Sequence, residues 1–107
     1  MVPHNTKLVY NVTNKVTHQI HKEWLQWMKQ IHIPAVLATG CFLDATILKV
    51  SEVDDEEGPT YAIQYYATRE QEYERYVQEF STSLRQDTIN KWGDQFIAFR
   101  TIMEVVN

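Results

Sequence analysis

Hydrophobic and polar residues alternate with two different periods along this chain, and the period switches several times. Alternation at every second residue predicts strands with one apolar and one mixed face. These strands cover residues 8–16, 41–50, 60–67 and 96–105. Apolar residues that recur three and four positions apart predict amphipathic helices over residues 18–33 and 69–92. The resulting order is strand, helix, strand, strand, helix, strand.

This order is the signature of the ferredoxin-like fold, an α+β sandwich with β-α-β-β-α-β connectivity. It predicts a four-stranded antiparallel sheet that carries two helices on one face, with the second and fourth strands at its edges. The chain has 107 residues, of which 44% are hydrophobic, enough for one core and too few for two. We therefore expect a single domain over residues 1–107.

Local signals set the expected ends of the helices. Thr17 is a suitable cap for the first helix. Pro34 lacks an amide hydrogen and restricts the residue before it, so we expect the first helix to break after Ile33. One further turn then ends in a left-handed cap at Gly40. The sequence Thr68–Gln71 predicts a capping box at the start of the second helix.

The helices cover only one face of the predicted sheet. The alternation of the last strand places Ile97, Phe99, Thr101, Met103 and Val105 on the covered face. The uncovered face is expected to carry Asn11, Thr13, Phe42, Asp44, Thr46, Gln64, Tyr66, Phe96 and Arg100. Leaving aromatic side chains in water is costly, so we expect a homodimer in which a second copy covers this face. The two sheets would enclose a partly polar cavity, with Asp44 and Arg100 hypothesised to pair across the dimer.

Composition narrows the classes of partner and compartment. The net charge of −4 and the scattered basic residues argue against nucleic acid and anionic membranes as partners. Cys41 is the only cysteine, so no internal disulfide is expected and a reducing compartment is favoured. The N-terminus lacks the pattern of a secretion signal, and no apolar run has membrane-spanning length. These features together predict a cytoplasmic protein.

Five segments resemble an uncharacterised bacterial family, a domain of unknown function whose fold is of the dimeric α/β-barrel type. They are Tyr10–Thr13, Glu23–Met28, His32–Phe42, Tyr61–Tyr65 and Trp92–Arg100. The resemblance spans nearly the whole chain and implies the fold, but it implies no reaction. The wider superfamily includes cofactor-free monooxygenases, haem-degrading enzymes, isomerases and members with no known chemistry, so the fold alone does not select a function.

His32 is the candidate catalytic residue. It directly precedes Ile33 and Pro34, where a fixed backbone could direct an imidazole into a cavity as a proton shuttle. The alternative is a histidine at a helix C-terminus that bonds to the last carbonyls. The candidate ligand-binding residues on the mixed face are Asn11, Thr13, Gln64, Tyr66 and Arg100. The alternative for these residues is a dimer interface whose polar groups satisfy one another.

No metal or cofactor is expected from the sequence. His18 and His21 lie three residues apart on the first helix, but no further ligands follow at a recognisable spacing. The acidic run from Glu52 to Glu57 lacks the alternating ligands and central glycine of a calcium loop, so we interpret it as a solvated hairpin. Cys41 has no basic neighbour in sequence and is interpreted as a small buried hydrophobe.

The sequence thus favours a small cytosolic homodimer with a binding or structural role, and no motif in it identifies a reaction. The alternative is a cofactor-independent monooxygenase or isomerase that acts on a small aromatic or polyketide-like compound. In that alternative His32 handles the proton, while Asn11, Tyr66 and Arg100 hold an enolate or carboxylate. Haem handling is a third class and would need His32 or His21 as an axial ligand facing a larger void.

Overall fold

The computed structural model describes residues 2–107, which form one four-stranded antiparallel sheet packed against a layer of helices. The strands are β1 (Leu8–Val16), β2 (Ala45–Lys49), β3 (Thr60–Ala67) and β4 (Phe96–Glu104). Their order in the sheet is β2-β3-β1-β4, so β2 and β4 are the edges. The predicted ferredoxin-like α+β fold is confirmed.

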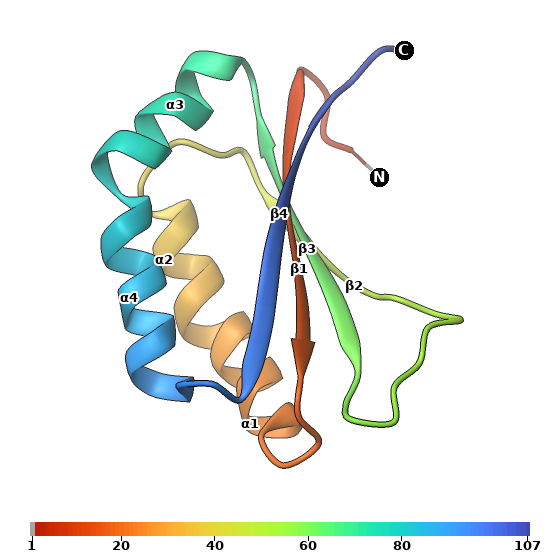
Figure 1. Cartoon of the computed structure of the whole chain (residues 1–107). Coiled ribbons are helices and arrows are strands. Elements are labelled where there is room, and N and C mark those ends of the chain that lie inside the picture. Colours follow the sequence, from red (N-terminus) through yellow and green to blue (C-terminus); the bar gives the residue numbers. More distant parts are fainter. Residues whose placement is uncertain (1) are drawn as a thin grey trace.

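All the helices lie on one side of the sheet, and the other side is bare (Figure 1). The first helical region consists of α1 (His21–Trp27), the π-helical segment η1 (Met28–His32) and α2 (Ile33–Leu37). The second consists of α3 (Glu70–Glu79) and α4 (Ser81–Trp92). Within residues 2–107, no helix is long and apolar enough to cross a membrane.

The predicted break after Ile33 is wrong, because the chain continues from η1 directly into α2. The Ile33 amide donates to the Met28 carbonyl, five residues earlier, which is the bonding pattern of a widened π-helical turn. Pro34 then lies in the first turn of α2, where its missing amide hydrogen costs no helical bond. The widened turn therefore absorbs the proline without ending the helical region.

Two of the predicted caps are not formed. Thr17 bonds to the side chain of Gln95 at 3.0 Å instead of capping α1, which begins at His21. The predicted capping box at Thr68–Gln71 is absent from the start of α3, where Arg69 occupies the cap position without a side-chain bond. Gly40 does adopt the predicted left-handed conformation, with φ of +78°.

Aromatic side chains fill much of the core between the sheet and the helices. Tyr10 and Tyr65 contribute from the central strands, and Tyr76 contributes from α3. Phe42 packs against all three, with its ring centroid 5.0 Å from that of Tyr76. The prediction that Phe42 lies on the uncovered face is therefore wrong. The reason is that β2 begins only at Ala45, so the strand alternation does not extend to residue 42.

The predicted orientation of β4 is reversed. The register pairs Val12 with Arg100 and Val16 with Phe96, so Arg100 and Phe96 share the helix-covered face. The bare face instead carries Ile97, Phe99, Thr101 and Met103. Both sets of alternate residues in this strand contain large apolar side chains, so the alternation alone does not decide which set faces the helices.

Several polar side chains on the bare face bond to one another. Asn11 donates to the Thr13 hydroxyl at 3.0 Å, and Tyr66 donates to the Thr46 hydroxyl at 2.8 Å. The large apolar side chains of this face are concentrated on β4, where Ile97 is 69% exposed and Phe99 is 60% exposed. The bare face thus combines bonded polar groups with exposed apolar side chains, most of them on β4 and one, Leu48, on the opposite edge strand β2.

The acidic segment between β2 and β3 is anchored to the end of β1 by a close backbone approach at Gly58. Gly58 has φ of +151°, and a Cβ at this position would overlap the Val16 carbonyl. We expect Gly58→Ala to lower the free energy of unfolding by about 3 kcal/mol, because backbone atoms must move to accept it. Gly93→Ala is the matched control: Gly93 also has positive φ but open space around it, and a loss of about 1 kcal/mol is expected. Urea unfolding checks both values, and equal losses would contradict the close-approach argument.

Candidate small-molecule pocket

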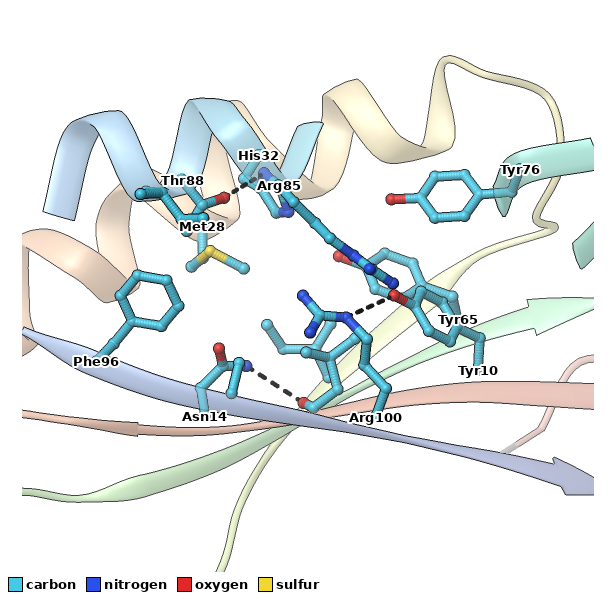
Figure 2. Close-up of a pocket in the computed structure, with 14 residues that line it drawn as sticks. Tyr10, Asn14, Met28, His32, Tyr65, Tyr76, Arg85, Thr88, Phe96 and Arg100 are labelled. Atoms are coloured by element: carbon cyan, nitrogen blue, oxygen red, sulfur yellow. Dashed lines mark hydrogen bonds between the residues drawn. The ribbon is translucent and has the colours of Figure 1, made fainter. Parts of the chain in front are cut away.

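A cavity of about 230 Å³ lies between the helix-covered face of the sheet and the helices η1 and α4. Tyr10 forms part of its floor, while Met28 and His32 cover it from η1 (Figure 2). Ile63, from β3, also lines it. The pocket opens toward solvent beside β4, where the lining residues Ile89 and Arg100 are exposed. It is therefore an interior pocket with one open side.

Small or polar side chains at the edge of the sheet leave this space unfilled. Asn14 and Ala98 are direct cross-strand partners on β1 and β4, and both line the pocket. The other β1 residues on this face are Leu8, Tyr10, Val12 and Val16. Asn14 thus interrupts an apolar face, and Ala98 opposite it is too short to fill the gap. A larger apolar pair here would close the core.

His32 is the last residue of η1, and its surroundings hold it in the neutral form. Burial lowers the pKa of His32 to about 4, and the positive charge of Arg100 adds to this effect, whereas Asp87 opposes it. The ring stacks on Trp27 with a centroid separation of 5.2 Å. The imidazole is therefore uncharged at neutral pH.

Contacts with Thr88 favour one tautomer of His32. Nδ1 lies 3.5 Å from the Thr88 hydroxyl, at the outer limit of a hydrogen bond. The Thr88 hydroxyl donates to the Leu84 carbonyl at 3.2 Å, so its oxygen is left to accept a hydrogen from Nδ1. This arrangement leaves Nε2 of His32 with a free lone pair, able to accept a proton or a hydrogen bond.

Two arginines reach the pocket from opposite walls. Arg100 Nε donates to the Tyr10 hydroxyl at 3.1 Å. Arg85, from α4, has a buried Nε with no hydrogen-bond partner among residues 2–107. Neither arginine forms a salt bridge within the described chain, and no aspartate or glutamate lines the pocket. The part of the pocket between Arg85 and Arg100 is therefore electropositive, whereas the negative charge of Asp87 acts on the His32 end.

The tyrosines that line the pocket are hydrogen-bond donors. Burial is the main cause that raises the pKa of Tyr65, and it also raises the pKa of Tyr76. Both phenols therefore keep their hydrogens at any physiological pH. Together with the guanidinium groups they give the pocket many more donors than acceptors.

The structure brings together only part of the predicted site. His32 and Arg100 both line the pocket. The other predicted ligand-binding residues, Asn11, Thr13, Gln64 and Tyr66, lie on the bare face, on the opposite side of the sheet. The six residues therefore do not form one site, and the pocket does not lie between two sheets. The hypothesised pairing of Arg100 with Asp44 also loses its basis, because Arg100 lies on the helix-covered face and bonds to Tyr10.

Sequence reasoning missed Arg85, Thr88 and Asn14 as pocket residues. Asn14 left a detectable signal, a polar residue in the apolar alternation of β1. Thr88 left a weaker one, since it follows Leu84 by four residues on the apolar stripe of the helix. Arg85 left none, because a charged helix residue beside the stripe is ordinarily solvated.

The other histidines that the sequence singled out bond elsewhere. His21 Nε2 lies 2.6 Å from the Tyr61 hydroxyl, and His18 Nε2 lies 3.0 Å from the Asp55 carbonyl. Over residues 2–107, no three side chains of histidine, cysteine, aspartate or glutamate gather in a way that could hold a metal ion. The pocket, with His32, is therefore the candidate site that the geometry favours.

A comparison with known families assigns the chain to one of them. A family model described as a domain of unknown function, DUF4286, matches residues 7–106. The chain belongs to the DUF4286 family. No curated protein sequence matches the chain significantly.

Solved structures with the same fold as this DUF4286 protein carry several different descriptions. An ethyl tert-butyl ether D (EthD) family protein from Bacillus halodurans has a TM-score of 0.68 at 10% identity, covering 92% of this chain and 99% of that chain. A dimeric ferredoxin-like protein from an uncultured marine organism has a TM-score of 0.67 at 9% identity, with 95% and 97% covered. SnoaB, a cofactor-independent oxygenase from Streptomyces nogalater, has a TM-score of 0.64 at 13% identity, with 94% and 95% covered. At these identities the likeness establishes the fold alone.

The depressed pKa of His32 makes the stability of this DUF4286 protein depend on pH. Between pH 6.5 and about pH 4 the unfolded chain binds a proton at His32 that the folded chain does not, so stability falls as pH is lowered through this window. The expected loss is about 3 kcal/mol. When the free energy of unfolding is measured in urea across this pH range, most of this pH dependence should be absent in His32→Gln. The control His18→Gln changes an exposed histidine and should keep it; equal slopes in wild type and His32→Gln would contradict the buried neutral state.

Proposed function

We propose that this DUF4286 protein is a homodimer that binds a small organic molecule in the pocket between the sheet and the helices of each protomer. The observation that carries the proposal is the convergence of polar groups from four elements on one cavity in an otherwise packed core. They are Asn14, His32, Arg85 and Arg100, from β1, η1, α4 and β4. Polar groups with free bonding capacity beside an apolar cavity are typical of ligand sites.

The size and walls of the pocket limit the ligand. An engineered apolar cavity of about 150 Å³ binds benzene, so about 230 Å³ suits a molecule of one or two fused rings. Met28, Ile63 and Phe96 provide apolar wall area for such rings. A compact, partly aromatic ligand therefore fits both the volume and the chemistry of the site.

The bare face of the sheet supports the dimer. Ile97, Phe99 and Met103 form an exposed apolar row along β4, and such rows mark association surfaces. A two-fold related copy would bury both rows at once. One of the solved structures with this fold is described as dimeric. We assign Asn11, Thr13, Gln64 and Tyr66 to this interface, where Asn11 bonds to Thr13 and Tyr66 bonds to Thr46.

A cofactor-independent oxygenase or isomerase is the second candidate function. The position of His32 Nε2, free in the pocket, favours it, because this nitrogen can accept a proton from an acidic position of a bound aromatic compound. Burial lowers the pKa of His32 and makes it a weak base in the free protein, and an anion formed beside the ring would raise that pKa again. The electron pair left on that compound would be stabilised as an enolate by the neighbouring guanidinium groups. SnoaB, with the same fold, is described as a cofactor-independent oxygenase. Under this alternative the ligand is converted, whereas a binding protein releases it unchanged.

The dimer is tested at Phe99. Light scattering coupled to size-exclusion chromatography is expected to give the mass of two chains for the wild type. Phe99→Glu places a charge in the apolar row and should yield a folded monomer, because two such charges would meet across the two-fold interface. Val53→Glu, at an exposed apolar residue in the β2–β3 connection, is the matched control and should stay dimeric. A wild-type monomer at micromolar concentration would overturn the dimer.

Ligand binding is tested by filling the pocket. Ala98→Leu extends an apolar side chain into the cavity and should preserve or slightly raise the melting temperature, because it fills unoccupied space. In a thermal-shift screen of one- and two-ring fragments, compounds that stabilise the wild type should lose their effect on this variant. Ala38→Leu, at an exposed position after α2, is the control and should respond as the wild type does. Fragments that stabilise Ala98→Leu as strongly as the wild type would show that they bind elsewhere.

A further inference from the structure

The charge of the pocket identifies the class of ligand more closely. We infer that the site is selective for organic anions, and that a planar acidic group such as a carboxylate lies between Arg85 and Arg100. This inference rests on the proposed function, since it concerns the same pocket. It goes further by naming the charge of the ligand and the residues that would recognise it.

Arg85 and Arg100 are free to bind such a group. In the described part of the chain, Arg69 and Arg75 form salt bridges with Glu72 on α3, whereas Arg85 and Arg100 form none. Arg85 and Arg100 instead extend toward one another from α4 and β4, and Arg100 bonds to the Tyr10 hydroxyl (Figure 2). Two guanidinium groups repel each other, so holding both at one pocket is unfavourable until an anion joins them.

The buried Nε of Arg85 is the second observation that points to an anion. It is shielded from solvent and bonds to no group in residues 2–107. An unsatisfied donor on a charged group costs stability, and a small shift of the Arg85 side chain would bring this donor against an oxygen anion in the pocket. The Tyr10 hydroxyl already accepts a hydrogen bond from Arg100, so its own hydrogen is available for the same anion.

The rest of the lining favours an organic anion over an inorganic one. Phosphate or chloride would leave the apolar walls around Met28, Ile63 and Phe96 without contact. A carboxylate on an aromatic ring satisfies both parts of the pocket. Nε2 of His32 and the side-chain oxygen of Asn14 are acceptors in the same cavity, so a hydroxyl or amine substituent on the ring would add a further bond.

The experiment uses two probes of the same shape and different charge, 2-naphthoate and 2-naphthamide, titrated into the wild-type protein by calorimetry at neutral pH. The naphthoate is expected to bind at least tenfold more tightly than the amide, because its bonds to guanidinium are charge-assisted. Inorganic phosphate is titrated as a third probe and is expected to bind more weakly than the naphthoate.

Variants of Arg85 test whether this residue causes the preference for naphthoate over naphthamide. Arg85→Gln should lower naphthoate affinity about tenfold or more and bring it near that of the amide. The same variant should melt at a higher temperature than the wild type without ligand, because the buried Nε that lacks a hydrogen-bond partner is removed. Arg85→Lys should recover part of the preference. Arg69→Gln, which removes an exposed arginine outside the pocket, is the matched control and should retain all of it.

The outcomes separate the inference from the proposed function. Equal affinities for naphthoate and naphthamide, or a preference that survives Arg85→Gln, would overturn the anion inference while leaving the pocket as a ligand site. If phosphate binds as tightly as naphthoate, the claim that the site prefers organic anions to inorganic ones is overturned. Binding of neither naphthyl probe would count against the pocket as a site for ligands of this size, and the inference would fail with it.

Discussion

β4 lies at the edge of the sheet, and its alternating side chains point into two different environments. Phe96, Ala98 and Arg100 line the pocket, whereas Ile97 and Phe99 lie on the bare face. Since backbone geometry fixes this alternation, the strand cannot shift by one residue without exchanging the two sets. The proposed ligand site and the proposed dimer interface are therefore built on one strand. Packing a second copy against β4 would also restrain the residues that line the open side of the pocket.

The position of His32 depends on the π-helical turn that precedes Pro34. In a regular helix, the proline would remove a backbone bond and clash with the preceding turn. The wider turn of η1 avoids this and ends at His32, where the ring stacks on Trp27 and meets Thr88 from α4. Widened turns of this kind are frequent at functional sites. The local irregularity thus places a neutral imidazole beside the cavity rather than at an exposed helix end.

The fold was predictable because it depends on periodicity, whereas the site depends on exceptions to periodicity. The alternation in β1 and β3 predicted their buried faces correctly. It failed in β4, where apolar residues occupy both faces and register with β1 decides the orientation. Arg85 was unpredictable for a related reason: its burial depends on how closely α4 approaches β4, a tertiary distance that no sequence spacing records. Asn14 could have been recognised, since a polar residue in an apolar strand face calls for a bonding partner.

The residues around the pocket make the fold less stable than a fully packed apolar core would. Leu or Val in place of Asn14 and Ala98 would close the gap and remove a polar group from the core. The guanidinium of Arg85 carries an unsatisfied donor into the same region. A packing gap and one buried donor without a partner, Arg85 Nε, thus lie at the same cavity, and an organic anion would relieve both. The other buried polar atoms without a partner, on Thr6, Trp24 and Trp92, belong to residues that do not line it. Part of its binding free energy would then come from removing a cost already present in the free protein, as expected of a preorganised site.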